Sequence, residues 1–128
     1  MEIEKEKIQN TKIIKITFGN ERNEDSNELM GTIELDIENQ NQFIEHINAL
    51  LDEGENLIIL SLSQISYIDS SGLWAIFESF KKAEQRNGKI VLLNPKKDVR
   101  RVLDITKISS KIKIFEENES AISYLTQE

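Results

Sequence analysis

The 128-residue chain is long enough for one domain around one hydrophobic core, and its 38% apolar and 30% charged residues are typical of a soluble globular protein. It contains no cysteine, which excludes a disulfide framework, a thiolate zinc site and a cysteine nucleophile. Its 16 basic and 23 acidic residues give a net charge of −7, so direct binding of nucleic acid, which needs a basic face, is not expected.

Neither the start of the chain nor its apolar runs indicate export or a membrane. Residues Met1–Glu6 alternate in charge and lack the apolar core of a secretory signal. The longest apolar stretches, such as Leu57–Leu60, are far too short to cross a bilayer. The one basic cluster, within residues 96–101, is short and is interpreted as a solvated helix face. We therefore expect a cytoplasmic protein without membrane insertion.

The first third of the chain predicts three strands and a polar loop. Residues 2–8 alternate weakly between apolar and polar, and Lys12–Phe18 is rich in β-branched residues. Residues 19–30 are too polar for a core and predict a loop or a long hairpin tip. Gly31–Ile37 alternates again and predicts a third strand. We expect antiparallel pairing among these N-terminal strands.

A helix and a buried strand follow. Asn39 suits the N-cap of a helix, and Gln42 stands where a capping box places its second side chain. Gly54 suits the left-handed residue after the helix end, and Asn56–Leu62 is a short apolar run that predicts a central strand covered on both faces. Between them, apolar residues recur three and four apart, on one helical face: Phe43, Ile44, Ile47, Leu50 and Leu51.

The rest of the chain alternates helices and strands. After residues 63–68 and a turn, a helix is expected to run to about Arg86, where Asn87-Gly88 ends it. A strand at 89–93, a helix that begins near Pro95, a strand at 111–115 and a helix at 119–125 complete the pattern. Strand–helix–strand units with short connections imply parallel neighbours and right-handed crossovers. We predict a single α/β domain over residues 1–128, with a mixed, mostly parallel β-sheet and about four α-helices.

The turn Asp69-Ser70-Ser71-Gly72 leaves the expected central strand and opens a helix. The first N–H groups of a helix have no internal acceptor, so one interpretation is that this turn is simply a helix cap. In the other, a serine there carries a phosphate beside these N–H groups and the positive end of the helix dipole. The phosphate would add about −1.5 to −2 charges near Asp69 and repel a partner that binds the bare turn. Gly72 would leave room for a partner's backbone or a kinase's nucleotide.

The segment Ile65–Leu73 resembles the signature of the STAS family, especially its anti-sigma-factor antagonists. The similarity continues through Asn87–Leu93 and Val99–Thr106 and covers about Asn56–Leu125, more than half of the chain. Upstream the match is looser, because the family's Gly-Glu-(Ile/Leu)-Asp motif corresponds here to Ile33–Asp36, with Ile in place of Gly, and the preceding loop is longer than usual. The resemblance implies the STAS fold.

What the resemblance implies for function is a binding switch and not an enzyme. In such antagonists a serine kinase, itself the anti-sigma factor, phosphorylates the serine directly after the motif's aspartate. The bare antagonist binds the kinase, the phosphorylated form releases it, and a metal-dependent serine phosphatase resets the switch. Carried over, the phosphoacceptor is Ser70, with Ser71 as runner-up. The implied partner-binding residues are Asp69, Ser70, Ser71 and Gly72, together with Asp36.

Trp74 departs from the family pattern, which usually has a small residue, often glycine, at this position. We expect this side chain to pack inward as core. The alternative is that it stands at the partner-binding surface, where tryptophan is a frequent anchor. In that case the partner differs from the usual small kinase.

No other site emerges. His46 is the only histidine and is offset from the apolar stripe of its helix, so a triad with Ser70 lacks its base. The acidic loop within residues 19–30 lacks the ligand spacing of a calcium site, and no glycine-rich phosphate-binding motif occurs. We therefore predict no catalytic residue, metal ligand or cofactor. The alternative function, which Trp74 and the long loop leave open, is an unphosphorylated STAS scaffold or an accessory subunit of a transporter or sensory complex.

Overall fold

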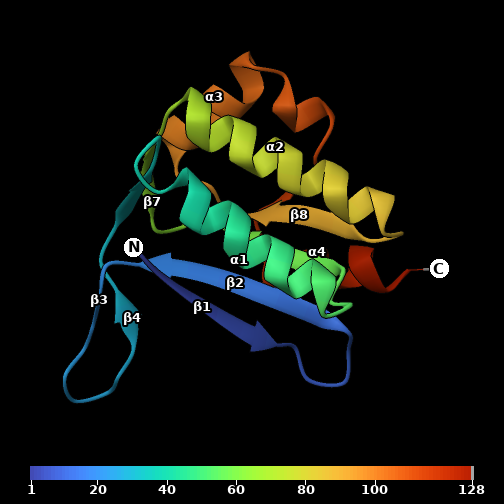
Figure 1. The fold of residues 1–128 in the computed structure, drawn as a ribbon, viewed down its shortest axis with the longest axis horizontal. Coiled ribbons are helices and arrows are strands. Elements are labelled where there is room, and N and C mark those ends of the chain that lie inside the picture. Colours follow the sequence, from blue (N-terminus) through green and yellow to red (C-terminus); the bar gives the residue numbers. More distant parts are fainter. Residues whose placement is uncertain (128) are drawn as a thin grey trace.

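The computed structural model describes residues 1–127 and is built around a five-stranded sheet with the order β1-β2-β6-β8-β9 (Figure 1). β1 pairs antiparallel with β2, and all other neighbours in this sheet are parallel. The predicted mixed, mostly parallel sheet is therefore confirmed. Its strands are β1 (Glu2–Lys7), β2 (Ile13–Gly19), β6 (Leu57–Ser61), β8 (Lys89–Leu93) and β9 (Ile114–Phe115).

Four α-helices cover the two faces of this sheet: α1 (Gln40–Asp52), α2 (Ser70–Gln85), α3 (Lys97–Ile105) and α4 (Asn118–Thr126). A short 3₁₀ turn, η1 (Ile108–Ser110), follows α3. In Figure 1, α1 and α2 run side by side over the sheet. Within residues 1–127, no helix combines the length and the apolar character that crossing a membrane requires.

The middle strand β6 shows why its sequence is a continuous apolar run. Ile58 and Leu60 point to the core under α1, α2 and α3, whereas Ile59 belongs to a second cluster with Ala121 and Leu125 of α4. Successive side chains of a strand point to opposite faces, and here both faces are covered. The prediction of a central strand buried on both sides is confirmed.

Two small pairings lie outside the main sheet. β5 (Ile33–Leu35) pairs parallel with β7 (Ile65–Ile68), so the third predicted strand is shorter than expected and does not join the antiparallel pair. The turn at residues 69–72 therefore leaves β7 and not the central strand, which corrects the sequence-based prediction. β7 escaped prediction because it is short and its register with β5 shifts after Ile33, which breaks the regular alternation.

The predicted polar loop contains a hairpin. β3 (Glu21–Arg22) and β4 (Leu29–Met30) pair antiparallel, and the ribbon extends away from the body of the domain at the lower left of Figure 1. The Arg22 Nη1 lies 2.7 Å from the Glu4 Oε1, which fastens the base of the hairpin to the edge strand β1. This outcome matches the hairpin alternative for residues 19–30.

The ends of α1 agree only in part with the sequence signals. Gly54 has φ +90°, as expected for the residue after a helix end. The capping box is wrong, because the Asn39 Oδ1 accepts a hydrogen bond from the Asp36 N–H at 2.9 Å and the Gln42 Nε2 donates to the Met1 carbonyl at 2.8 Å. Asn39 thus holds the loop before α1, and Gln42 ties the helix to the start of the chain.

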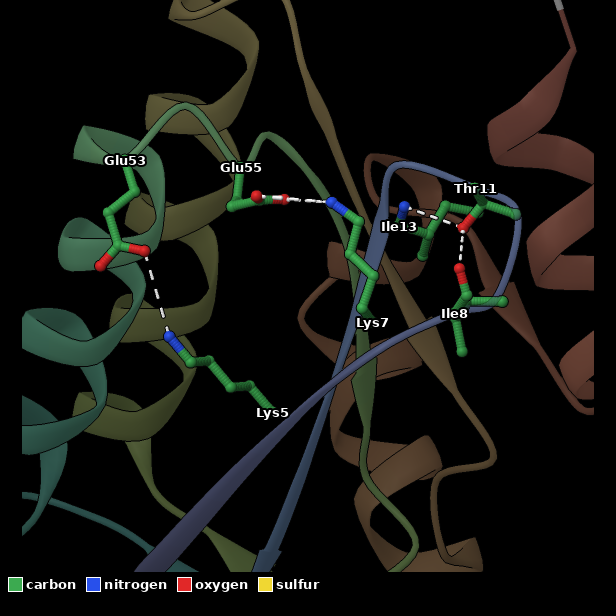
Figure 2. A network of polar contacts seen from close by, with 7 residues as sticks. All are labelled: Lys5, Lys7, Ile8, Thr11, Ile13, Glu53 and Glu55. Carbon is green, nitrogen blue, oxygen red and sulfur yellow. Dashed lines mark hydrogen bonds and ion pairs between the residues drawn. The ribbon is translucent and has the colours of Figure 1, made fainter.

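Figure 2 shows how β1 is fixed at the opposite end of α1. The Lys5 Nζ lies 4.0 Å from the Glu53 Oε2, and the Lys7 Nζ lies 3.3 Å from the Glu55 Oε2. The Thr11 Oγ1 donates to the Ile8 carbonyl at 2.8 Å and accepts from the Ile13 N–H at 3.0 Å, which closes the β1–β2 turn. Exposed ion pairs of this kind contribute about 0–1 kcal/mol each.

Candidate functional site

The turn at residues 69–72 joins the end of β7 to the first turn of α2. Asp69 is the N-cap residue of α2, and its Oδ1 accepts a hydrogen bond of 2.9 Å from the Gly72 N–H. Its Oδ2 accepts a bond of 3.2 Å from the N–H of Ile37, in the loop between β5 and α1. The Asp69 N–H donates to the Leu35 carbonyl at 3.2 Å. The Asp69 carboxylate therefore caps the helix, as one interpretation of the motif held, and also clamps the β5–α1 loop against it.

Gly72 is buried against the chain's own backbone. A Cβ at this position would lie 2.3 Å from the Leu35 carbonyl oxygen and 2.9 Å from the Ile68 Cγ1, closer than real Cβ contacts. The space that Gly72 leaves is therefore filled by Leu35 of β5, and not left open for a partner's backbone or a nucleotide. The prediction that Gly72 leaves room for a partner is therefore wrong. Glycine is needed here because only glycine lets α2 start this close to β5.

The two serines of the turn differ in exposure. Ser70 is exposed at the first position of α2, and Ser71 is half-buried at the second. Neither hydroxyl hydrogen-bonds to any residue in the range 1–127, and the N–H groups of both serines also lack an acceptor in that range. A 16-residue helix thus presents free N–H groups and its positive dipole end beside an exposed hydroxyl.

Asp36 lies in the loop that Asp69 clamps. Its Oδ1 accepts a hydrogen bond of 3.0 Å from the Glu38 N–H, and its carbonyl accepts from the Gln40 N–H at 2.9 Å. The side chain is half-buried and shapes the entry to α1. The structure thus brings Asp36 to within one residue of the Asp69–Ile37 contact, although the two aspartates are 33 positions apart in sequence.

Trp74 does not pack inward. Its side chain is 52% exposed, so the expectation that it forms part of the core is wrong. It lies along a groove of about 350 Å³, lined mainly by apolar atoms, between α2 and the segment that follows α3. We call it the Ser70 groove, and its lining residues are Ser70, Leu73, Trp74, Phe77, Thr106, Lys107, Ile108 and Lys111.

Other large apolar side chains are exposed around the same turn. Tyr67 precedes it on β7, Ile37 bonds to Asp69 through its N–H, and Ile105 ends α3 next to the groove residue Thr106. Sequence reasoning missed all three. For Ile105 a signal existed, because it is offset from the buried stripe of Val99 and Leu103. We call these side chains the apolar ring, with their exposed fractions: Ile37 (62%), Tyr67 (53%), Trp74 (52%) and Ile105 (72%).

The comparisons with known proteins decide the family. The family model for the STAS domain matches residues 29–121, which is most of the chain and includes the upstream segment where the motif looked looser. The chain belongs to the STAS domain family. The resemblance identified from the residues around the turn is therefore confirmed.

Relatives of this STAS domain are anti-sigma factor antagonists by name. A candidate anti-sigma factor antagonist of Thermotoga neapolitana is 35% identical over 95 residues, which are 73% of this chain and 84% of the relative. The crystal structure of a candidate anti-sigma factor antagonist from Thermotoga maritima aligns with a TM-score of 0.79 and 25% identity, over 98% of this chain and 95% of that one.

The fold also matches the anti-sigma factor antagonist SpoIIAA in its unphosphorylated form, with a TM-score of 0.66. That alignment has 21% identity and covers 96% of each chain. A structure of SpoIIAA from Bacillus in the phosphorylated form aligns similarly, with a TM-score of 0.65. At this identity the likeness shows the fold alone. The 35% identical relative places this STAS domain in the family of the anti-sigma factor antagonists, and these solved structures share its fold.

Proposed function

We propose that this STAS domain is a partner-switching anti-sigma-factor antagonist without catalytic activity of its own. Unphosphorylated, it binds an anti-sigma-factor serine kinase in the cytoplasm and so frees a sigma factor. Phosphorylated at Ser70, it releases the kinase, and a metal-dependent serine phosphatase restores the binding form. The observation that carries the proposal is the exposed Ser70 hydroxyl, which lies at a helix N-terminus and lines the same groove as the exposed Trp74.

The geometry favours Ser70 over Ser71 as the phosphoacceptor. A kinase must reach the hydroxyl with its nucleotide, and Ser70 is exposed whereas Ser71 is half-buried. A phosphate on Ser70 would meet the free N–H groups of the first helical turn and the positive end of the α2 dipole. The domain can therefore carry the modification at little cost to folding.

The apolar ring supplies the partner surface in this proposal. Exposed large apolar side chains that gather on one surface indicate an interaction site, and here Trp74 lines the same groove as Ser70, while Tyr67 and Ile37 flank or contact the turn that carries it. A phosphate adds about −1.5 to −2 charges in their midst. A partner that buries these side chains would have to desolvate that charge, which weakens binding. Asp69, Gly72 and Asp36 serve the same surface by holding its loops in place.

The experiment begins with the serine kinases of the source organism that resemble anti-sigma factors. Each is purified and incubated with the domain and ATP, and phosphate is mapped by mass spectrometry. We expect modification at Ser70, its loss in Ser70→Ala and its retention in the matched variant Ser71→Ala. If neither serine is modified, the switch is overturned, and the alternative of an unphosphorylated scaffold or accessory subunit gains support.

A binding measurement tests the charge mechanism. Calorimetry with the kinase should show that Ser70→Ala binds like the wild type, whereas Ser70→Asp binds about tenfold more weakly or worse, because a carboxylate carries part of the phosphate's charge. Equal affinity of the two variants would contradict the idea that charge at this position controls release.

A further inference from the structure

The Ser70 groove differs in charge from the rest of the domain. The chain has 23 acidic and 16 basic residues, yet none of the eight groove residues is acidic and two are lysines, Lys107 and Lys111. In the range 1–127, neither lysine has an ion-pair partner. Lys81, which lies 5.3 Å from the Phe77 ring centroid, is already paired with Glu78 at 3.0 Å. The groove is thus an apolar floor with two uncompensated positive charges on an acidic protein.

Lys107 directly follows Thr106, the C-cap residue of α3, at the position where helices commonly end with a left-handed residue. Lys107 has φ +65°, a left-handed conformation that favours glycine or asparagine. The chain places asparagine at four other left-handed positions: Asn10, Asn27, Asn87 and Asn94. At the end of α3 this position holds a lysine, and its side chain lines the groove. The end of α3 thus brings a positive charge to the groove.

We infer that the Ser70 groove receives a segment of the protein partner that presents a large apolar side chain next to a carboxylate. The apolar side chain would pack against Trp74, Phe77 and Ile108, and the carboxylate would meet Lys107 and Lys111. The volume of about 350 Å³ suits one or two side chains and lies at the lower limit for a small-molecule site. Charge complementarity selects an acidic segment, since the groove has the opposite sign to the domain as a whole.

This inference rests on the proposed function and deepens it. Ser70 lines the same groove, so a phosphate on Ser70 would compete with the partner's carboxylate for the two lysines. The switch then acts in two ways at one place: the phosphate is repelled by the acidic segment, and it neutralises the charges that attract that segment. Trp74 determines specificity, because a small residue at this position would leave the groove without one wall.

The chemistry of the groove can be tested without a partner. Trp74 is the only tryptophan of the chain and lines the groove, so its fluorescence reports occupancy. Octanoate, which joins a carboxylate to an apolar chain, should shift the emission to the blue and saturate. Octylammonium, with the opposite charge, should bind about tenfold more weakly. Equal response to both probes would overturn the charge preference.

The partner arm uses the kinase that binds the wild-type domain and measures affinity by calorimetry. Trp74→Ala should weaken binding by about thirtyfold, as for a buried aromatic anchor, and Trp74→Phe should restore most of it. The double variant Lys107→Gly with Lys111→Gln should weaken binding by about tenfold. The matched control Lys97→Gln, an exposed lysine outside the groove, should bind like the wild type.

Glycine was chosen at position 107 so that weaker binding is not caused by unfolding. It adopts the left-handed conformation more easily than lysine and should keep or raise the melting temperature. If the kinase binds the wild type and all groove variants equally, the groove inference fails and the proposed function stands. If the kinase does not bind the wild type, both fail. Self-association of the wild-type domain that Trp74→Ala abolishes would also overturn the inference, because the groove would then hold a second copy of the chain.

Discussion

Two surfaces of this STAS domain differ in whether their exposed side chains have interaction partners within the domain. Around Ser70, large apolar side chains are exposed and the groove lysines Lys107 and Lys111 have no acidic partner in the range 1–127. Along the edge strand β1, most charged side chains are paired: Lys5 with Glu53, Lys7 with Glu55, and Glu2 and Glu4 with Arg22. The groove lysines near Ser70 thus have no ion pairs within residues 1–127, whereas most charged side chains along β1 do.

The difference separates a surface for association from one that avoids it. An open edge strand offers unpaired N–H and C=O groups to other chains, and charged side chains discourage such pairing. The Ser70 surface lacks such protection, although its underlying frame is held by specific contacts at Asp69 and Gly72. A binding switch needs this arrangement, in which the contacts at Asp69 and Gly72 hold the backbone in place beneath side chains that are free to bind a partner.

The largest effect should come from breaking the frame at Gly72. In Gly72→Ala the new Cβ would lie 2.3 Å from the Leu35 carbonyl oxygen, a backbone atom that cannot move without shifting β5. We expect a loss of about 2–3 kcal/mol of unfolding free energy, measured by urea unfolding followed by circular dichroism. Partner binding should fall as well, because α2 and the β5–α1 loop separate.

Gly54→Ala is the matched control for this change. Gly54 has φ +90° but open space around its Cβ position, so alanine there costs only the left-handed conformation, about 1 kcal/mol. It also lies after α1, away from the apolar ring. A cost at Gly54 equal to or above that at Gly72 would contradict the close approach to Leu35.

Breaking the clamp at Asp69 should have the next largest effect. Asp69→Ala removes the acceptors of the Gly72 and Ile37 N–H groups, with a cost of about 2 kcal/mol. Asp69→Asn keeps one oxygen and should lose about 1 kcal/mol. The same urea experiment ranks the two variants, and a neutral Asp69→Ala would show that the clamp contributes nothing to stability.

The frame of the fold was largely predictable from the sequence. The short apolar run at Asn56–Leu62 indicated a strand covered on both faces, and the corresponding strand β6 lies in the middle of the sheet. The position of Asp69 before α2 also followed from helix-capping chemistry. Such signals are local, since they depend on residues within one element.

What the sequence did not reveal depends on contacts between distant segments. Gly72 was interpreted as open space, because nothing local shows that Leu35 of β5 fills it. Trp74 was expected in the core, because a large aromatic side chain in an amphipathic helix usually packs inward. The groove needs the Thr106–Lys111 segment beside α2, and only the tertiary fold brings these together.

His46, on the paired side of the molecule, should give a smaller effect that depends on pH. Its Nε2 is buried and has no hydrogen-bond partner among residues 1–127. Burial, followed by the positive charge of Lys5, lowers the pKa of His46 against an opposing effect of Glu53. The unfolded chain therefore binds this proton more readily than the fold does. Stability is fully present above the ordinary pKa of about 6.5 and falls as the pH drops through it.

The variant His46→Leu isolates this contribution. Its unfolding free energy should fall less than that of the wild type between pH 7.5 and 5.5, because the carboxylates titrate equally in both proteins and only the imidazole is missing. Urea unfolding at the two pH values measures the difference. The same decrease in both proteins would show that His46 has no role in the pH dependence.

The smallest effect should come from the ion pair between Lys7 and Glu55, which lies on the surface and is screened by salt. The Lys7 Nζ lies 3.3 Å and 3.5 Å from the two Glu55 carboxylate oxygens, yet half of the lysine side chain is exposed. Lys7→Gln should cost about 0.5 kcal/mol at low ionic strength and nothing measurable in 1 M salt. Lys12→Gln is the control, because Lys12 is exposed and forms no ion pair with any of residues 1–127. A cost above about 1.5 kcal/mol that persists in salt would mean that β1 depends on this pair, and the paired surface would then belong to the frame of the fold.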